Sequence, residues 1–181
     1  MEVRILGAHN IESKEISPTS LLIDGCLAVD AGALTSTLSL HQQEKIKAVL
    51  ISHHHFDHTR DLPTLGFNAA LWQGQVEVYA LRYTLDVIIS CLLDGKIYVN
   101  FLKYPSTTKP AIKLNSIEPY KKEIIAGYEV LPVPVKHNVP TVGYQIDSQQ
   151  GGSLFYTGDT GPGLADCWQH ISPHLLFTGV I

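Results

Sequence analysis

The stretch Ser52–His58 constrains this chain more than any other feature of its sequence. It reads Ser-His-His-His-Phe-Asp-His and holds four of the nine histidines. A histidine-rich tract can also be a purification tag or a solvated loop, but this one contains an aspartate and follows Lys47–Ile51, an apolar run typical of a buried strand. The stretch therefore predicts a metal site at the end of a strand.

The spacing H-x-H-x-D-H gives these side chains a shared direction. In extended backbone, side chains two residues apart point to the same side, so His53 and His55 can bind one cation while His54 faces away. If the chain then turns, Asp57 and His58 come within reach of a second cation. Imidazole and carboxylate ligands suit Zn²⁺, and Mn²⁺ or iron are the alternatives. The stretch thus predicts up to two Zn²⁺ ions.

Three residues outside this stretch are candidates for the same site, because each lies at or near the end of an apolar strand. His137 would supply a third nitrogen, although a lone histidine is more often structural. The glycines beside Asp159 would let its backbone approach a metal closely, and one oxygen to each of two cations would make it a bridge; the alternative is an ordinary residue of a Gly-rich turn. Asp30 could accept the second N–H of a metal-bound histidine, with a turn residue as the equal alternative. The remaining histidines have no spacing that recruits them: His9, His41, His170 and His174.

Short strands and helices are expected throughout the chain. Strands are expected at residues 2–7, 20–25, 26–30, 47–51, 76–80, 128–131, 132–136, 141–147, 153–156 and 174–177. Helices are expected at residues 34–41, 59–72, 82–93 and 164–170, with Asp61 as the N-cap of the second. Residues 96–122 show a mixed pattern. The chain is therefore expected to form one α+β domain over residues 1–181, with its chemistry where strands give way to loops.

Composition narrows the class of protein. The net charge of −4 gives no general attraction to nucleic acid or to an anionic membrane. We expect no signal peptide, because Glu2 stands where a basic region belongs and the apolar run after it is too short. We expect no membrane-spanning helix, because acidic residues interrupt the apolar runs. The three cysteines are scattered, so we expect small buried residues in a reducing compartment and a cytoplasmic protein.

With these residues in place, the chain resembles the metallo-β-lactamase superfamily. Its markers are Leu27–Gly32, the H-x-H-x-D-H loop, His137 and Gly158–Gly161. Weaker markers are most similar to phosphodiesterase-type members, the class II cyclic-nucleotide phosphodiesterases and the ribonuclease Z group: residues 29–34, 78–81, 84–86 and 158–162. The resemblance implies an αββα sandwich with metals at one edge of its sheets. It also implies the ligand sets: His53, His55 and His137 for the first metal, Asp57 and His58 for the second, and Asp159 as the bridge.

The resemblance implies one further histidine, in a Gly-His-Leu-like segment downstream of Asp159. No residue of this chain matches it, because the sequence stops at Phe177–Ile181. We therefore expect a sandwich that lacks its last C-terminal elements. A fragment, a natural truncation and a ligand from a partner chain all remain open. An exposed apolar face is expected, with poor solubility as a monomer or pairing into a homodimer.

The leading hypothesis for function is hydrolysis of a small phosphodiester by a metal-bound hydroxide, with Asp57 orienting the nucleophile. A glyoxalase-II-like thioesterase is an alternative, because metals polarise a thioester carbonyl equally well. A non-catalytic metal-binding remnant of the same fold is another. A β-lactamase is disfavoured, since such enzymes are normally exported. Nucleic acid is a weaker candidate substrate, because only a loose group of lysines supports it: Lys103, Lys109, Lys113, Lys121 and Lys122.

Overall fold

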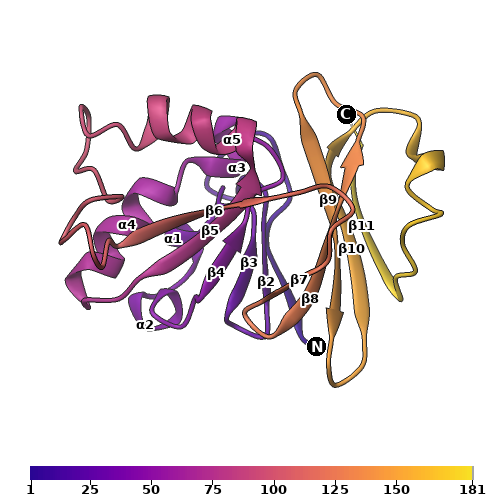
Figure 1. The fold of residues 1–181 in the computed structure, drawn as a ribbon, viewed down its shortest axis with the longest axis horizontal. Helices are drawn as coiled ribbons and strands as arrows, with labels where there is room; N and C mark the ends of the chain where they lie inside the picture. The colour runs from indigo at the N-terminus through magenta and orange to yellow at the C-terminus, as the bar shows by residue number, and fades with distance from the viewer. Residues whose placement is uncertain (181) are drawn as a thin grey trace.

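Two β-sheets packed face to face form the centre of the computed structural model, which describes residues 1–180 apart from the side chains of Ala165 and Val180 (Figure 1). The first sheet has the order β1 (Val3–Gly7), β2 (Ser20–Ile23), β3 (Leu27–Val29), β4 (Ala48–Leu50), β5 (Val76–Leu81) and β6 (Ile112–Ile117). The second has the order β11 (Leu175–Val180), β10 (Ser153–Thr160), β9 (Thr141–Ser148), β8 (Tyr128–Val135) and β7 (Glu123–Ile125). The two-sheet architecture that the family resemblance implied is confirmed.

The helices lie on the outer face of the first sheet (Figure 1). They are α1 (Leu34–Thr37), α2 (Leu40–Gln43), α3 (Phe56–Thr59), α4 (Leu62–Leu71), α5 (Arg82–Val87) and the π-helical turn η1 (Ile88–Leu92). Strands β3 to β6 are parallel. Parallel neighbours need crossover connections, and helices lie in all three of these crossovers. Helices α1 and α2 lie between β3 and β4, α3 and α4 between β4 and β5, and α5 and η1 between β5 and β6.

Burial on both faces explains why the central strands of the first sheet are apolar without a break. In β4, Val49 packs toward the helices, whereas Ala48 and Leu50 pack toward the second sheet. In β3, Ala28 likewise faces the helices between two residues that face the second sheet. Successive side chains alternate between the faces, so a strand buried on both sides must be apolar at every position.

The outer face of the second sheet is covered by the segment between β10 and β11. Leu164, Cys167 and Ile171 of this segment pack with Leu131, Val133, Val135 and Phe155 of the sheet. The helix predicted at residues 164–170 is wrong, since the structure has one 3-10 turn there, η2 (Leu164–Asp166). Glycine and proline flank this stretch, at Gly161–Gly163 before it and at Pro173 after it, so they leave room only for a short helix, which is marginal. Exposed apolar side chains lie here and in β11: Trp168, Leu175 and Leu176.

Other local predictions need correction. The helix expected at residues 34–41 is two helices, because Ser39 caps the start of α2. Strand β6 lies in the region left unassigned, since only its end residues are buried and its polar centre hides the pattern. Asp61 precedes α4 as predicted, but its carboxylate accepts the N–H of Thr35 at 2.7 Å and so connects α4 to α1.

Two expectations from composition can be compared with the fold. Cys167 is buried as expected, whereas Cys26 is half-buried and Cys91 is exposed. The prediction that the cysteines are buried is therefore wrong for Cys91. Among the described residues, every helix is too short or too polar to cross a bilayer.

Tyr144 connects the two sheets close to the histidine loop, and its replacement by phenylalanine is expected to destabilise the fold. Its side chain is fully buried, and its hydroxyl donates to the carbonyl of Ile51 at 2.7 Å. Tyr144→Phe leaves that carbonyl without its partner, so the free energy of unfolding should fall by about 1–3 kcal/mol. Urea denaturation measures the change. Tyr120→Phe, at an exposed tyrosine, is the control and should change it by less than about 0.5 kcal/mol.

Candidate metal centre

The histidine loop runs from the end of β4 into the short helix α3. His55 occupies the N-cap position of α3 in extended backbone, and the chain turns immediately after it. His53 and His55 therefore lie on the extended part, whereas Asp57 and His58 lie in the helical turn. This is the turn that the second metal group requires.

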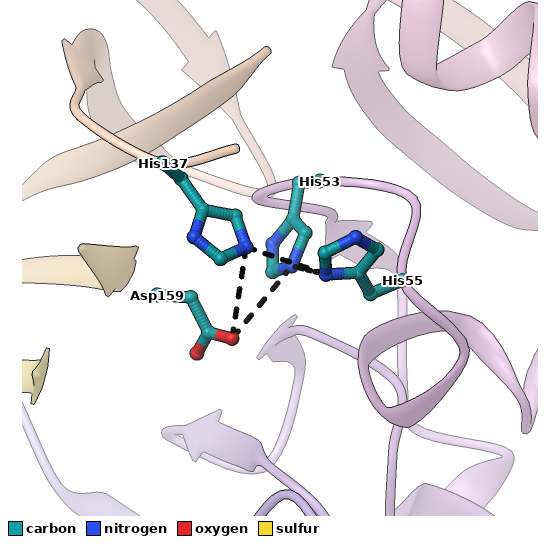
Figure 2. Close-up of side chains that lie close together, drawn as sticks. All are labelled: His53, His55, His137 and Asp159. Atoms are coloured by element: carbon teal, nitrogen blue, oxygen red, sulfur yellow. Dashed lines mark hydrogen bonds and ion pairs between the residues drawn. The ribbon is translucent and has the colours of Figure 1, made fainter. Parts of the chain in front are cut away.

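The first candidate group consists of His53, His55, His137 and Asp159 (Figure 2). His53 Nε2 lies 3.0 Å from His55 Nδ1, and His137 Nε2 lies 3.3 Å from the same nitrogen. Asp159 Oδ2 lies 3.9 Å from His53 Nε2 and 4.0 Å from His137 Nε2. Donor atoms spaced in this way suit a tetrahedral zinc site, where ligand atoms about 2.0–2.1 Å from the ion lie about 3.3 Å apart.

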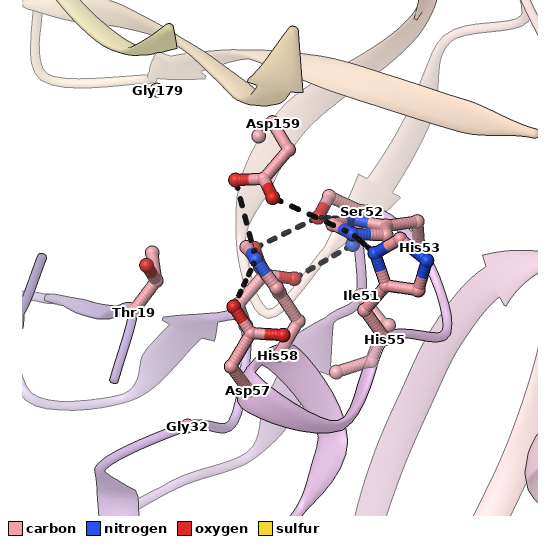
Figure 3. A network of polar contacts seen from close by, with 12 residues as sticks. Thr19, Gly32, Ile51, Ser52, His53, His55, Asp57, His58, Asp159 and Gly179 are labelled. Atoms are coloured by element: carbon pink, nitrogen blue, oxygen red, sulfur yellow. Dashed lines mark hydrogen bonds and ion pairs between the residues drawn. The ribbon is translucent and has the colours of Figure 1, made fainter. Parts of the chain in front are cut away.

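The second candidate group consists of Asp57, His58 and Asp159 (Figure 3). His58 Nε2 lies 3.4 Å from Asp57 Oδ2 and 3.3 Å from Asp159 Oδ1. Asp159 thus presents Oδ2 to the first group and Oδ1 to the second, which is the arrangement expected of a bridging carboxylate. The structure brings all six predicted ligand residues together, and their role as metal ligands stays a prediction.

The carboxylates around His58 favour a positive charge at this position. The Nε2 of His58 is buried and has no hydrogen-bond partner among the described residues, although two carboxylate oxygens face it. Burial lowers the pKa of His58, but the carboxylates, above all Asp30, outweigh burial and raise the pKa to about 12. A divalent cation beside Nε2 would satisfy both the unpartnered nitrogen and the carboxylates, so the donor set fits a metal.

His53, in contrast to His58, favours the neutral form of its imidazole. Its side chain is fully buried, and burial together with the charge on His58 lowers its pKa to about 3. Burial also lowers the pKa of His137. Both imidazoles are therefore neutral at physiological pH, which is the form that binds a metal.

Asp30 lies behind the second group, in the position predicted for it. Its side chain is fully buried, and Oδ2 accepts from His58 Nδ1 at 2.7 Å. Burial raises the pKa of Asp30, but His58 outweighs burial, so the carboxyl stays ionised. Its backbone has a φ of +57°, in the left-handed region that aspartate enters more readily than most residues. Such strain is typical of residues that a functional site holds in place.

Two residues that the sequence did not single out complete the contacts of Asp30. Ser52 donates its N–H and its hydroxyl to the two carboxylate oxygens, each at 2.8 Å. Tyr156 donates its hydroxyl at 2.6 Å. No spacing in the sequence could identify Tyr156, because 126 residues separate it from Asp30. His54 belongs to neither candidate group and packs edge-on against Tyr83, with ring centroids 5.5 Å apart.

Gly158 allows β10 to approach the histidine loop closely enough to place Asp159. Its φ of +64° lies in the left-handed region, where a side chain is strained. A Cβ at this position would lie 2.8 Å from the Cβ of Ser52. Glycine before Asp159 therefore has a structural reason here, which is the close contact with Ser52.

Residues 19–177 match the family model described as "Beta-lactamase superfamily domain". The metallo-β-lactamase fold protein YhfI from Bacillus subtilis superposes with a TM-score of 0.73 at 19% identity, over 96% of this chain and 68% of that chain. Human tRNase Z, short form (ELAC1), gives 0.67 at 17% identity, over 97% and 76%. Unliganded yeast PDE1 gives 0.68 at 16% identity, over 87% and 64%. At these identities the structures show a shared fold.

One curated protein also matches part of the chain. An octanoyltransferase from Porphyromonas gingivalis (strain ATCC BAA-308 / W83) is 31% identical over 104 residues. These residues are 57% of this chain but 20% of that protein, so the chain spans about one fifth of the length of this relative.

Proposed function

The chain belongs to the beta-lactamase superfamily domain family, and from this membership we propose that it is a metal-dependent phosphodiesterase. Proteins of the superfamily are generally hydrolytic metalloenzymes. The observation that carries the proposal is that Asp159 presents one oxygen to each of two candidate groups. Two cations held a few ångströms apart by a shared carboxylate form a centre that suits in-line displacement at phosphorus.

Zn²⁺ ions at the two groups, or Mn²⁺ or iron in their place, would supply Lewis acidity that lowers the pKa of water and neutralises charge on phosphoryl oxygens. Asp57 can orient the attacking water, since its side chain is 21% exposed and so reaches solvent. Burial raises the pKa of Asp57, but His58 outweighs burial and lowers it, so Asp57 is an ionised hydrogen-bond acceptor at neutral pH. Asp30 fixes the orientation of the His58 ring through Nδ1.

A small phosphodiester is a better candidate substrate than nucleic acid. Three lysines of the loose group are paired with carboxylates, which cancels much of its positive charge: Lys113 with Glu77 at 2.6 Å, Lys121 with Glu118 at 3.6 Å and Lys122 with Glu129 at 2.6 Å. Binding to a nucleic-acid backbone depends on uncompensated lysine and arginine. The fold shared with a human tRNase is compatible with phosphodiester chemistry but does not itself assign RNA to this chain.

Hydrolysis of a thioester is the second candidate function. The observation that favours it is the match to a protein named octanoyltransferase, which by its name moves an acyl group. The same two groups could polarise an acyl carbonyl. Assaying a small acyl thioester beside a phosphodiester with the same preparation separates the two functions.

The proposal is tested by hydrolysis of bis(p-nitrophenyl) phosphate. The Zn²⁺- or Mn²⁺-loaded protein should cleave it, a chelator should abolish cleavage, and added metal should restore it. His55→Ala should lower kcat/KM by about a hundredfold or more, because His55 Nδ1 faces both His53 and His137. His41→Ala, at a histidine whose side chain is 75% exposed, is the matched control. An unchanged rate in His55→Ala would contradict the proposal.

A further inference from the structure

A cavity of about 300 Å³, here called the outer cavity, lies on the outer face of the second sheet. Its floor comes from β8 and β9, and its other wall comes from the end of the segment between β10 and β11. Figure 1 shows this segment on the side of the second sheet that faces away from the first sheet. The six candidate metal ligands lie elsewhere, so the outer cavity is a separate feature. Its lining includes Lys122, Leu131, Gln145, Asp147, His170 and Ile171.

Gln145 is a buried polar residue among apolar neighbours. It is 4% exposed and lies in β9 directly between Leu131 of β8 and Phe155 of β10. Its Nε2 donates to Asp147 Oδ1 at 2.7 Å, whereas its buried Oε1 has no hydrogen-bond partner among the described residues. Such an acceptor costs about 1–3 kcal/mol, so packing alone does not explain a glutamine here. What the amide does is hold the carboxylate of Asp147 at the outer cavity.

Asp147 supplies the negative charge of the outer cavity. Its side chain is half-buried, and Gln145 occupies Oδ1. Oδ2 accepts no hydrogen bond from the described part of the chain. Lys122 also lines the cavity, but its ammonium is already paired with Glu129 at 2.6 Å. The lining therefore offers a carboxylate oxygen that is free to bind a cation.

An aromatic pair forms another wall of the outer cavity. The ring of His170, which lines the cavity, packs on the ring of Tyr120 with a centroid distance of 4.5 Å. Tyr120 has a φ of +63°, in the left-handed region that bulky residues rarely enter. Its N–H donates to the carbonyl of Pro132 at 2.8 Å, which keeps the backbone in this conformation. Strain of this kind is typical of residues held for a function, and here it holds the ring on which His170 rests.

The size and lining of the outer cavity indicate what fits it. Leu131 and Ile171 give apolar surface for a hydrocarbon stem, and Asp147 attracts a positively charged end. Sites for drug-sized molecules have volumes of about 300–1,000 Å³, so about 300 Å³ suits one charged group on a short stem. An anion would meet only Lys122, whose charge Glu129 already balances.

We propose that the outer cavity is a binding site for a small organic cation, an alkyl chain that ends in a guanidinium or ammonium group, with Asp147 as its counter-ion. Gln145 is a positioning residue, because it acts through the carboxylate that it holds. The stem of the cation lies against Leu131 and Ile171. This site does not depend on the proposed phosphodiesterase activity.

NMR chemical-shift titration with n-butylguanidinium and with its neutral counterpart n-butylurea tests the outer cavity. The two probes have nearly the same shape and differ in charge. The wild type should bind the cation at least tenfold more tightly than the urea, with the largest shifts at the amides of Asp147 and Ile171. A wild type that binds neither probe, or binds both equally well, would overturn the inference.

Two variants separate the roles of the carboxylate and of the amide. Asp147→Asn keeps the shape of the side chain but removes its charge, and it should weaken binding of n-butylguanidinium at least tenfold. Gln145→Leu replaces the unpartnered amide with an apolar side chain. It should unfold at the urea concentration of the wild type or above, yet bind the cation at least threefold more weakly.

An aspartate far from the outer cavity provides the matched control. Asp86→Asn, at an exposed residue of α5, removes the same charge and should bind n-butylguanidinium as the wild type does. Asp147→Asn keeping the full affinity would show that the carboxylate is not the counter-ion, and the proposal would fail. Gln145→Leu keeping the full affinity would contradict the positioning role.

Discussion

Replacing Asp159 with alanine is expected to lower the rate of phosphodiester hydrolysis by about 10³-fold or more. The reason is that this carboxylate belongs to both candidate groups, with Oδ2 near His53 and His137 and Oδ1 near His58. Its removal takes one donor atom from each group and also leaves the buried His58 with less compensation for a positive charge. Steady-state kinetics with bis(p-nitrophenyl) phosphate, together with metal analysis of the same preparation, measure the effect.

An exposed aspartate supplies the control for this substitution. Asp86→Ala removes a carboxylate that is exposed and pairs with Arg82 on the surface, so it should leave the rate within about twofold. Asp159→Ala retaining more than about a tenth of wild-type activity would be incompatible with a shared carboxylate at the centre.

Replacing Asp30 with alanine is expected to have the largest effect on stability. Four donors converge on its buried carboxylate: the N–H and hydroxyl of Ser52, Nδ1 of His58 and the hydroxyl of Tyr156. Without it, these buried groups lose their acceptor and His58 loses its strongest carboxylate neighbour. The free energy of unfolding should fall by about 3–5 kcal/mol, and metal affinity should fall by about 10–100-fold.

Chemical denaturation and metal titration measure these two effects separately. Asp30→Asn keeps the shape of the side chain and one acceptor oxygen, so it should destabilise less than Asp30→Ala while still weakening metal binding. Asp147→Ala, at a half-buried aspartate of the second sheet, is a control. If Asp30→Ala unfolds at the same urea concentration as the wild type, Asp30 does not hold the site together in the way described.

The local part of the site could be predicted from the sequence because it depends on directions within a few residues. The alternation of side chains in extended backbone places His53 beside His55, and a turn at Phe56 brings Asp57 and His58 round. The sequence indicated His137 and Asp159 as candidate ligands because each lies at or near the end of an apolar strand. Their pairing with the histidine loop depends on how the two sheets stack, which no local spacing encodes.

The contacts around Asp30 could not be predicted from the sequence. Tyr156 reads as an ordinary core residue of β10, and only the packing of the two sheets directs its hydroxyl to Asp30. Strand β6 was missed for a related reason. It lies at the edge of the first sheet and carries polar residues between Ile112 and Ile117, so burial there is set by neighbours distant in sequence.

The most direct test of the central claim, that His137 and the histidine loop together hold the first cation, is the number of Zn²⁺ ions that the wild type and its His137→Ala variant retain after dialysis. The account predicts about two equivalents per chain for the wild type and about one for His137→Ala, which keeps the second group of Asp57, His58 and Asp159. A wild type that retains no metal, or a His137→Ala variant that retains as much as the wild type, would contradict it.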